Sequence, residues 1–392
     1  MPTESAGRPV SAAVLFVAFL RLGLTGFGGP AMISYIREMS VRRRRWLAPE
    51  AFAQGIPLCQ SIPGATAMQV AAYVGLRAGG PWGALAAYVG FGLPAFGLMA
   101  ALSAAYQAGQ SLAWVLAGFR GLQVIVVALV ANAALEFGRA SIVSWRDAVL
   151  AAGAAGVLLL HGNPMAVIAA TAALGTVLYH GQALPAGAAR FAASSGGGRA
   201  LRFAAGAAAI LVLGLTALFA FDRRLFDLAL LMMRVDVFAF GGGFASVPLM
   251  LDEVVNIRHW LDGPTFMDGI ALGQVTPGPI VITATFVGYR LAGLLGAVAA
   301  TVGVFAPSFL MVLLTVPYFD RLQGSAAFRH AVRGVLASFV GLLASVTLHF
   351  GAAAAWSAPA VLIAAAALAA LRLKVDVLWV VLAGAAVSVA VL

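Results

Sequence analysis

Six arginines in this chain form three pairs whose members lie 213 positions apart (234 − 21, 290 − 77 and 333 − 120). The pairs are Arg21 with Arg234, Arg77 with Arg290, and Arg120 with Arg333. A guanidinium presents a planar fork of N–H donors that suits an oxyanion, and holding one at the centre of a membrane helix costs roughly 2.5–3.5 kcal/mol. Arg21 and Arg234 fall about mid-way along apolar runs, so their duplication predicts anion binding. The other four fall nearer expected helix ends, where snorkelling of the side chain to the membrane surface is the ordinary explanation. Of these four, Arg77 and Arg290 are retained as candidates for anion binding.

Two glycine-rich segments are duplicated together with the arginines. They consist of Phe27, Gly28, Gly29 and Pro30 in one copy and of Phe240, Gly241, Gly242 and Gly243 in the other. Adjacent glycines weaken a membrane helix, and a following proline favours the first turn of a new one. Each segment should therefore be two helical pieces, whose freed N-terminus offers N–H donors and a positive dipole end to a bound anion. The alternative is close helix packing through small residues.

A second kind of break is also present in both copies. It is formed by Gln60, Ser61, Pro63 and Gly64, and by Gln274, Thr276, Pro277 and Gly278. Proline removes a donor and clashes with the preceding helical turn, so each segment must bend or reverse, and residues 51–77 are predicted to be re-entrant. The glutamine, serine and threonine side chains are neutral donors that could orient an oxyanion. The alternative is a kink in which glutamine satisfies freed carbonyls.

Acidic residues within the apolar runs are few and are not duplicated. Asp236 aligns with Gly23, and Glu136 aligns with His349. Both acids are candidates for coupling transport to another ion, although Asp236 could equally pair with an arginine. No ligand-spaced histidine cluster, carboxylate pair or catalytic triad stands out, so we expect no metal, no cofactor and no enzymatic activity.

Composition identifies a membrane protein. Apolar residues make up 62% of the chain and charged residues 10%, and continuous apolar runs long enough for membrane helices recur along it. The alternation typical of a membrane β-barrel is missing from them. The predicted fold is therefore an all-α polytopic membrane protein. The net charge of +10 fits retention of arginine in cytoplasmic loops, and the Arg42–Arg45 run has no aromatic platform for nucleic acid.

The duplication defines the domain organisation. Residues 9–181 form a first repeat, 182–224 a flexible linker with one extra membrane helix, and 225–392 a second repeat. The loop at 37–50 is basic whereas its counterpart at 252–264 is acidic, which favours inverted repeats with discontinuous helices. The number of membrane spans leaves two alternatives for the relative orientation of the repeats. Five spans per repeat plus the extra helix would make the two copies parallel, whereas six spans per repeat plus the extra helix would make them inverted.

These motifs resemble the chromate ion transporter family in its long, two-domain form. The resemblance covers nearly the whole chain and rests on the two kinds of break in both copies, together with Pro94-Ala95-Phe96 and Ala306-Pro307-Ser308-Phe309. The resemblance implies a multi-pass protein of the cell inner membrane that is built from two homologous domains of opposite orientation. It also implies that the protein moves chromate outward and gives chromate resistance. Gly243 departs from the family's pattern, since Pro30 stands at the equivalent place in the first repeat.

The expected function is secondary transport of a tetrahedral divalent oxyanion through a site where the repeats meet. Chromate is the first choice, and sulfate transport or an anion channel of the same architecture is the alternative. The expected partners are the anion and the lipid bilayer, without nucleic acid, and a homo-oligomer is left open.

Overall fold

The structure, a computed structural model, describes residues 9–26, 31–109, 112–181, 197–318 and 324–391, and every regular element within these ranges is helical. The first repeat contains α1 (Ala12–Thr25), α2 (Ala31–Arg37), the π-helix η1 (Glu38–Arg43), α3 (Pro49–Ser61), α4 (Thr66–Gly109), α5 (Ala113–Ser141), α6 (Trp145–Leu159) and α7 (Pro164–Leu178). α8 (Gly197–Phe221) follows. The second repeat contains α9 (Arg223–Phe238), η2 (Gly243–Ala245), α10 (Ser246–Leu251), η3 (Asp252–Ile257), α11 (Gly263–Val275), η4 (Ile280–Ile282), α12 (Thr283–Thr315), η5 (Val316–Tyr318), α14 (Ala326–Ala353), α15 (Ala358–Arg372) and α16 (Val377–Val391). The prediction of an all-helical chain with two homologous repeats is confirmed.

The proline–glycine breaks fold the chain into helical hairpins. α3 ends just before Gly64, whose φ is +113°, and α4 then lies beside α3. The Tyr73 hydroxyl of α4 donates a hydrogen bond to the Ala51 carbonyl of α3 at 2.8 Å. In the second repeat, α11 likewise lies beside α12, where Gly269 of α11 packs directly against the Phe286 ring of α12. The interruption predicted within residues 51–77 is thus a tight reversal.

A second reversal follows each hairpin inside the long helix. α4 is interrupted at Gly80, with φ +71°, and α12 at Gly293, with φ +58°. A side chain on Gly75 would overlap the carbonyl oxygen of Gly83, so only glycine permits the two pieces of α4 to lie this close. These turns were not predicted as breaks. They place Arg77 and Arg290 three residues before a reversal, in agreement with their expected positions near helix ends.

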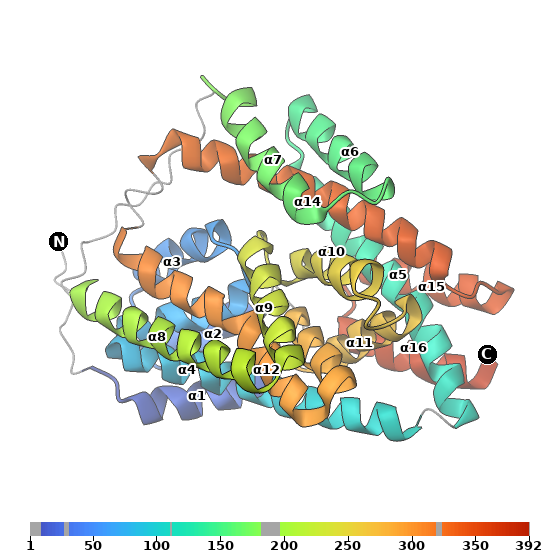
Figure 1. The fold of residues 1–392 in the computed structure, drawn as a ribbon, viewed down its shortest axis with the longest axis horizontal. Helices are drawn as coiled ribbons and strands as arrows, with labels where there is room; N and C mark the ends of the chain where they lie inside the picture. The colour runs from blue at the N-terminus through green and yellow to red at the C-terminus, as the bar shows by residue number, and fades with distance from the viewer. Residues whose placement is uncertain (1–8, 27–30, 110–111, 182–196, 319–323, 392) are drawn as a thin grey trace.

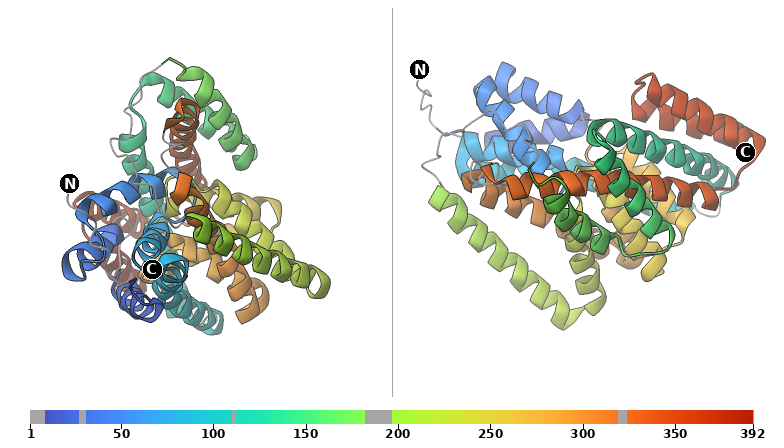
Figure 2. Two further views of the ribbon diagram at one scale, coloured as in Figure 1. Left: turned by 90° about the vertical axis from the view of Figure 1, so that its left-hand side faces the viewer. Right: turned by 90° about the horizontal axis from the view of Figure 1, so that it is seen from above.

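The last helices of each repeat are exchanged between the repeats. α6 and α7 of the first repeat pack against α14 of the second, and α15 and α16 pack against α5 of the first (Figure 1). Figure 2 shows α15 and α16 beside α5, on the opposite side of the molecule from α8. Each repeat therefore encloses part of the other, and neither forms a separate layer.

Within the described residues, five helices are long and apolar enough to cross a membrane. They comprise Thr66–Gly109, Val115–Ser141, Gly198–Phe221, Ile280–Tyr318 and Ala326–Ala353, and shorter apolar helices accompany them. α8 projects from the body, contacting α9, α12 and α4 along one side. The part of the predicted linker at 182–196 lies outside the described residues.

The segments expected as loops at 37–50 and 252–264 begin as π-helices instead. η1 and η3 each end in a turn where one residue has positive φ, namely Arg45 at +52° and His259 at +51°. Glu38 lies within 3.4 Å of both Arg42 and Arg43. The basic run of the first repeat is therefore an exposed helical surface, where such ion pairs stabilise the fold only slightly.

Candidate functional site

The breaks of both repeats meet in one region, which we call the crossing (residues 26, 62–65, 239–243 and 276–279). The Gly64 amide donates to the Ala239 carbonyl at 2.8 Å, and the Gly278 amide donates to the Gly26 carbonyl at 3.0 Å. Ala239 is the counterpart of Gly26, and Gly278 of Gly64, so the bonds are reciprocal, as across a two-fold axis. Each repeat thus supplies a donor to a carbonyl freed by the other. In this conformation the two amides are engaged between repeats and are not open to an anion.

The glycine-rich break of the second repeat packs into the crossing. Gly241 and Gly242 have φ values of +89° and +105°, which glycine adopts without strain. A side chain on Gly242 would contact the Thr66 hydroxyl of the first repeat at 3.5 Å. α9 ends before these glycines and helix resumes at Gly243, so the predicted interruption is confirmed. The corresponding candidates of the first repeat lie outside the described residues: Phe27, Gly28, Gly29 and Pro30.

Asp236 is buried beside the Gly64 side of the crossing, with 1% of its surface exposed. Its carboxylate accepts the Ser308 amide at 2.7 Å and the Ser308 hydroxyl at 2.6 and 2.5 Å. The hydroxyl packs directly against Gly64. The pairing of Asp236 with an arginine, which the sequence left open, is wrong within the described residues. Hydrogen bonds from a neighbouring helix stabilise the carboxylate instead.

Gln69 adds a second buried polar group next to Gly64. It is fully buried, its amide nitrogen donates to the Pro63 carbonyl, and its amide oxygen has no hydrogen-bond partner in the described part of the chain. Gln69 therefore supports the break by replacing a donor that the helix no longer provides. The sequence analysis did not select Gln69, although its position six residues after Pro63 was a usable signal.

The glutamines predicted to orient an anion differ in their surroundings. Gln60 is exposed on α3, whereas the side-chain amide nitrogen of Gln274 is buried without a described partner. The hydroxyls next to them already donate to backbone carbonyls, Ser61 to Pro57 at 2.6 Å and Thr276 to Gly273 at 2.8 Å. Gln274 is therefore the side chain of this set whose donor is buried and left without a described partner.

The arginine pairs are also unequal in the structure. Arg21 is exposed on α1, while Arg234 lies 3.4 Å from the buried carboxylate of Glu253. Arg77 is partly buried. Arg290 lies over the Tyr106 ring, with 5.7 Å from its guanidinium carbon to the ring centroid, and its Nε is buried without a described hydrogen-bond partner.

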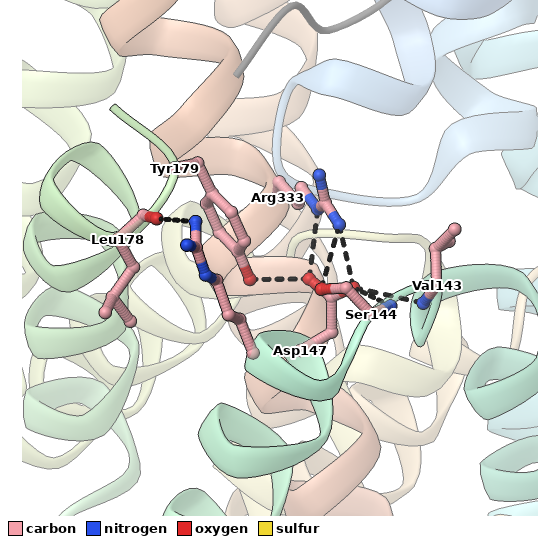
Figure 3. Close-up of polar contacts among 7 residues, drawn as sticks. Val143, Ser144, Asp147, Leu178, Tyr179 and Arg333 are labelled. Carbon is pink, nitrogen blue, oxygen red and sulfur yellow. Dashed lines mark hydrogen bonds and ion pairs between the residues drawn. The ribbon is translucent and has the colours of Figure 1, made fainter. Parts of the chain in front are cut away.

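Arg333 belongs to an ion pair that joins the repeats away from the crossing. Its guanidinium donates to both carboxylate oxygens of Asp147 at 3.0 and 2.9 Å, and to the Ser144 hydroxyl at 3.2 Å (Figure 3). The Tyr179 hydroxyl donates to the same carboxylate at 2.5 Å. Burial opposes ionisation of Asp147, but the bonds from Arg333, Tyr179 and Ser144 outweigh it and hold the pKa of this carboxyl well below its usual range. Arg120, the counterpart of Arg333, is exposed. Of these two arginines, Arg333 therefore joins the repeats and Arg120 does not.

Glu136, the other candidate for coupling, is exposed on α5 and accepts a hydrogen bond from Asn132 at 3.2 Å. Its counterpart His349 lines a cavity of about 340 Å³ together with His161 and Asp252. The cavity lies between the α6–α7 turn, α10, η3 and α14, and none of its lining residues belongs to the crossing. The structure therefore places neither Glu136 nor this cavity among the residues of the crossing.

Comparison with known proteins identifies the family. The chromate transporter family matches residues 13–176 and again residues 226–389. The chain is 41% identical over 372 residues to an uncharacterized transporter of Methanocaldococcus jannaschii, covering 95% of this chain and 92% of that protein. It is 32% identical over 375 residues to a chromate transport protein of Pseudomonas aeruginosa (91% and 85% covered). It is 30% identical over 339 residues to a chromate transport protein of Cupriavidus metallidurans, covering 85% of this chain and 81% of that protein.

No solved structure matches this chain. The family match falls on each repeat in turn, and relatives at 30–41% identity extend over most of the sequence. The resemblance noted from the helix breaks is confirmed. The chain is a multi-pass membrane protein and not an enzyme, and it belongs to the chromate transporter family.

Proposed function

We propose that this chain moves chromate, a tetrahedral divalent oxyanion, through the crossing. The observation that carries the proposal is the meeting of helix breaks from both repeats at one place. Next to this unwound backbone is Gln274, whose side-chain amide nitrogen is buried without a partner among the described residues. Non-helical backbone at membrane depth is tolerated where it lines a cavity or is enclosed by protein. The names of the relatives from Pseudomonas aeruginosa and Cupriavidus metallidurans support chromate as the substrate.

The two hairpins divide the proposed path into an entrance and a centre. Arg77 and Arg290 lie at the open ends of the hairpins, and Gln60 and Gln274 lie near the tips. Arginine at each entrance would attract the anion, and glutamine at the tips would orient it. Arg290 and Gln274 are the principal candidates because each holds a buried donor without a partner among the described residues.

The remaining candidates act closer to the crossing. Arg21 and Arg234 precede Gly26 and Ala239 by five residues, so each lies less than two helical turns from a break. In the proposed mechanism they supply positive charge while the glycine breaks supply backbone donors. Asp236, which the sequence offered as a candidate for ion coupling, lies at this place, where its buried carboxylate accepts hydrogen bonds from Ser308.

Alternating access would arise from rocking of one repeat against the other, with the copies inverted in the membrane. Rocking must break the reciprocal bonds of Gly64 and Gly278, which would free two amide donors for the anion. We propose outward movement across the cell inner membrane. An inside-negative potential favours export at roughly 2.3 kcal/mol per charge per 100 mV, or about 4.6 kcal/mol for a dianion.

Chromate uptake into everted membrane vesicles tests the proposal, because uptake there corresponds to export from the cell. Arg290→Ala and Gln274→Leu should each lower the initial rate at least about tenfold, since a hydrogen bond to a charged group is worth about 1.5–3 kcal/mol. The double variant Arg21→Ala with Arg234→Ala should lose more. Arg120→Ala, an exposed arginine outside the crossing, is the matched control and should leave the rate unchanged.

Absence of chromate uptake by vesicles that contain the wild-type chain would contradict the proposed function. Complete inhibition by equimolar sulfate, with faster sulfate than chromate uptake, would favour sulfate as the substrate. Accelerated exchange by unlabelled chromate on the opposite side is expected of a carrier, and its absence would favour an anion channel.

A further inference from the structure

Asp268 is a buried carboxylate held by the opposite repeat. It lies on α11 with 5% of its surface exposed. The Tyr106 hydroxyl of α4 donates to one carboxylate oxygen at 2.8 Å, and the Gln123 amide of α5 donates to the other at 2.9 Å. Both partners are neutral and both belong to the first repeat. Burial of an ionised carboxylate without a cation costs several kcal/mol unless the group binds a proton.

The helices around α11 bring no cation to Asp268 within the described part of the chain. α12 contributes Arg290, which contacts the Tyr106 ring and forms no ion pair with the carboxylate. α16 and η4 contain no ionisable residue. On α5, Arg120, Glu136 and Arg139 are exposed. Asp262, which caps the first turn of α11, is a second negative charge on the same side.

α14 approaches α11 at the end opposite to its basic residues. The contact is made by the Phe350 ring, 6.3 Å from the Phe266 ring. Arg329 precedes Phe350 by 21 residues, or about 30 Å of helix. Arg333 is bound to Asp147, and His349 lines the separate cavity. Arg77 of α4 lies before the Gly80 reversal, in the other hairpin. None of these cations compensates the Asp268 carboxylate.

Tyr106 links this carboxylate to the proposed entrance of the anion. Its hydroxyl binds Asp268, its ring lies 5.2 Å from the Phe286 ring, and Arg290 lies over the same ring. The Nε of Arg290, which has no hydrogen-bond partner in the described part of the chain, is thus separated from Asp268 by a single aromatic side chain. A dianion at Arg290 would be repelled by an ionised Asp268, and this repulsion is weakly screened in a buried region.

The equivalent place in the other half has no such group. Gln54 stands in place of Asp268, and Leu336 in place of Gln123. Duplication therefore retained the arginine at both entrances, as Arg77 and Arg290, but placed a titratable carboxylate beside one of them only.

We propose that Asp268 is a proton-binding site that takes up a proton when the oxyanion binds beside Arg290. The proton comes from water and adds to a carboxylate oxygen, with no other bond made or broken. Because the neutral carboxyl no longer repels the dianion, proton binding strengthens anion binding, and by linkage the anion strengthens proton binding equally. This inference rests on the proposed function. It identifies the proton as the ion whose binding is linked to that of the anion, and it places this proton at Asp268 rather than at Asp236.

Calorimetric titration of the purified full-length chain with chromate, at mildly alkaline pH in two buffers of different ionisation enthalpy, tests the inference. The wild type should take up about one proton per chromate bound, and its affinity should rise about tenfold for each unit by which pH falls. Asp268→Asn should bind chromate with no proton uptake and an affinity independent of pH. Asp236→Asn should keep the proton uptake.

A second variant keeps the test decisive if Asp268→Asn does not fold. Tyr106→Phe retains the carboxylate and removes one donor to its charged form, so the pH midpoint of chromate affinity should move upward. An unchanged midpoint, unchanged proton uptake by Asp268→Asn, or loss of uptake in Asp236→Asn alone would each overturn the inference. Failure of the wild type to bind chromate or sulfate would instead overturn the proposed function.

Discussion

The two sides of the crossing have nearly the same backbone and different polar groups. Gly64 and Gly278 have φ values of +113° and +117°, and each donates its amide to the opposite repeat. Next to Gly64 stand Asp236 and Ser308, joined by three hydrogen-bond contacts. Next to Gly278 the equivalent positions hold Gly23 and Ala95, and Ala95 packs directly against the Gly278 backbone. One side is polar and the other is apolar.

This difference indicates that duplication preserved geometry while charge diverged. The acids Asp147, Asp236 and Asp268 face Ala360, Gly23 and Gln54 at the equivalent positions. A buried carboxylate costs several kcal/mol unless its environment is built around it, and each of these three has hydrogen-bond donors from another helix. In the proposed mechanism the two halves would therefore bind the same anion through similar breaks and respond differently to protons.

The largest expected effect separates the two glycines of the crossing. In Gly64→Ala the new methyl group would overlap the Ser308 hydroxyl and force a non-glycine residue into positive φ, so we expect a loss above about 4 kcal/mol. Gly278→Ala suffers the same backbone strain but meets only the Ala95 methyl at 2.9 Å, so about 2–4 kcal/mol is expected. Thermal unfolding in detergent measures both, and equal losses would contradict the difference drawn here.

The next effect concerns the arginines that duplication placed at equivalent points of α5 and α14. Arg333→Met leaves the buried Asp147 carboxylate without its cation, and we expect a loss of about 3 kcal/mol, the lower end for a buried pair because Arg333 is partly exposed. Arg120→Met should change stability by less than about 0.5 kcal/mol. Denaturation midpoints of the two variants provide the measurement. A large effect of Arg120→Met would show that the first repeat contains a cationic contact of equal weight.

Most of the backbone architecture could be predicted from residue types. The breaks at Pro63-Gly64 and Gly241-Gly242 follow from proline and glycine chemistry, and the two repeats follow from the 213-residue offset. The reversals at Gly80 and Gly293 could not be predicted in this way, because one glycine in an apolar run is usually tolerated inside a helix. The feature of the sequence that could have indicated these reversals is the presence of a glycine at the same position of both repeats.

The candidate site was less predictable, because side-chain partners come from distant parts of the chain. For Asp236 the sequence left open both ion coupling and pairing with an arginine, yet the partner of its carboxylate is Ser308, 72 residues later. Arg333 was grouped with Arg120 by spacing, but the exchange of α6 against α14 gives only Arg333 an acid to bind. Asp268 meets Tyr106 and Gln123 only because the repeats enclose one another. Local sequence contains no signal for such contacts.

A smaller effect should be seen within the polar side of the crossing. Asp236→Asn keeps the shape of the side chain but weakens acceptance from the Ser308 amide and hydroxyl, so we expect a loss of about 1–3 kcal/mol. Ser308→Ala removes only the hydroxyl. A double-mutant cycle of these two changes should give a coupling energy of about 1–2 kcal/mol. Additive losses would mean that the carboxylate is stabilised by something other than Ser308.

The smallest effect tests whether the hydroxyls at the hairpin tips touch the anion. Thr276 is 2% exposed and already donates to the Gly273 carbonyl, so Thr276→Val should cost about 1 kcal/mol of stability. Ser61→Ala, on the more exposed tip, should cost about half as much. Because both hydroxyl protons are engaged by backbone, chromate uptake into everted vesicles should stay within about twofold of wild type for each variant. A tenfold fall for Thr276→Val alone would show that its hydroxyl turns from the helix to the anion during transport. The two tips would then differ in substrate contact as well as in exposure.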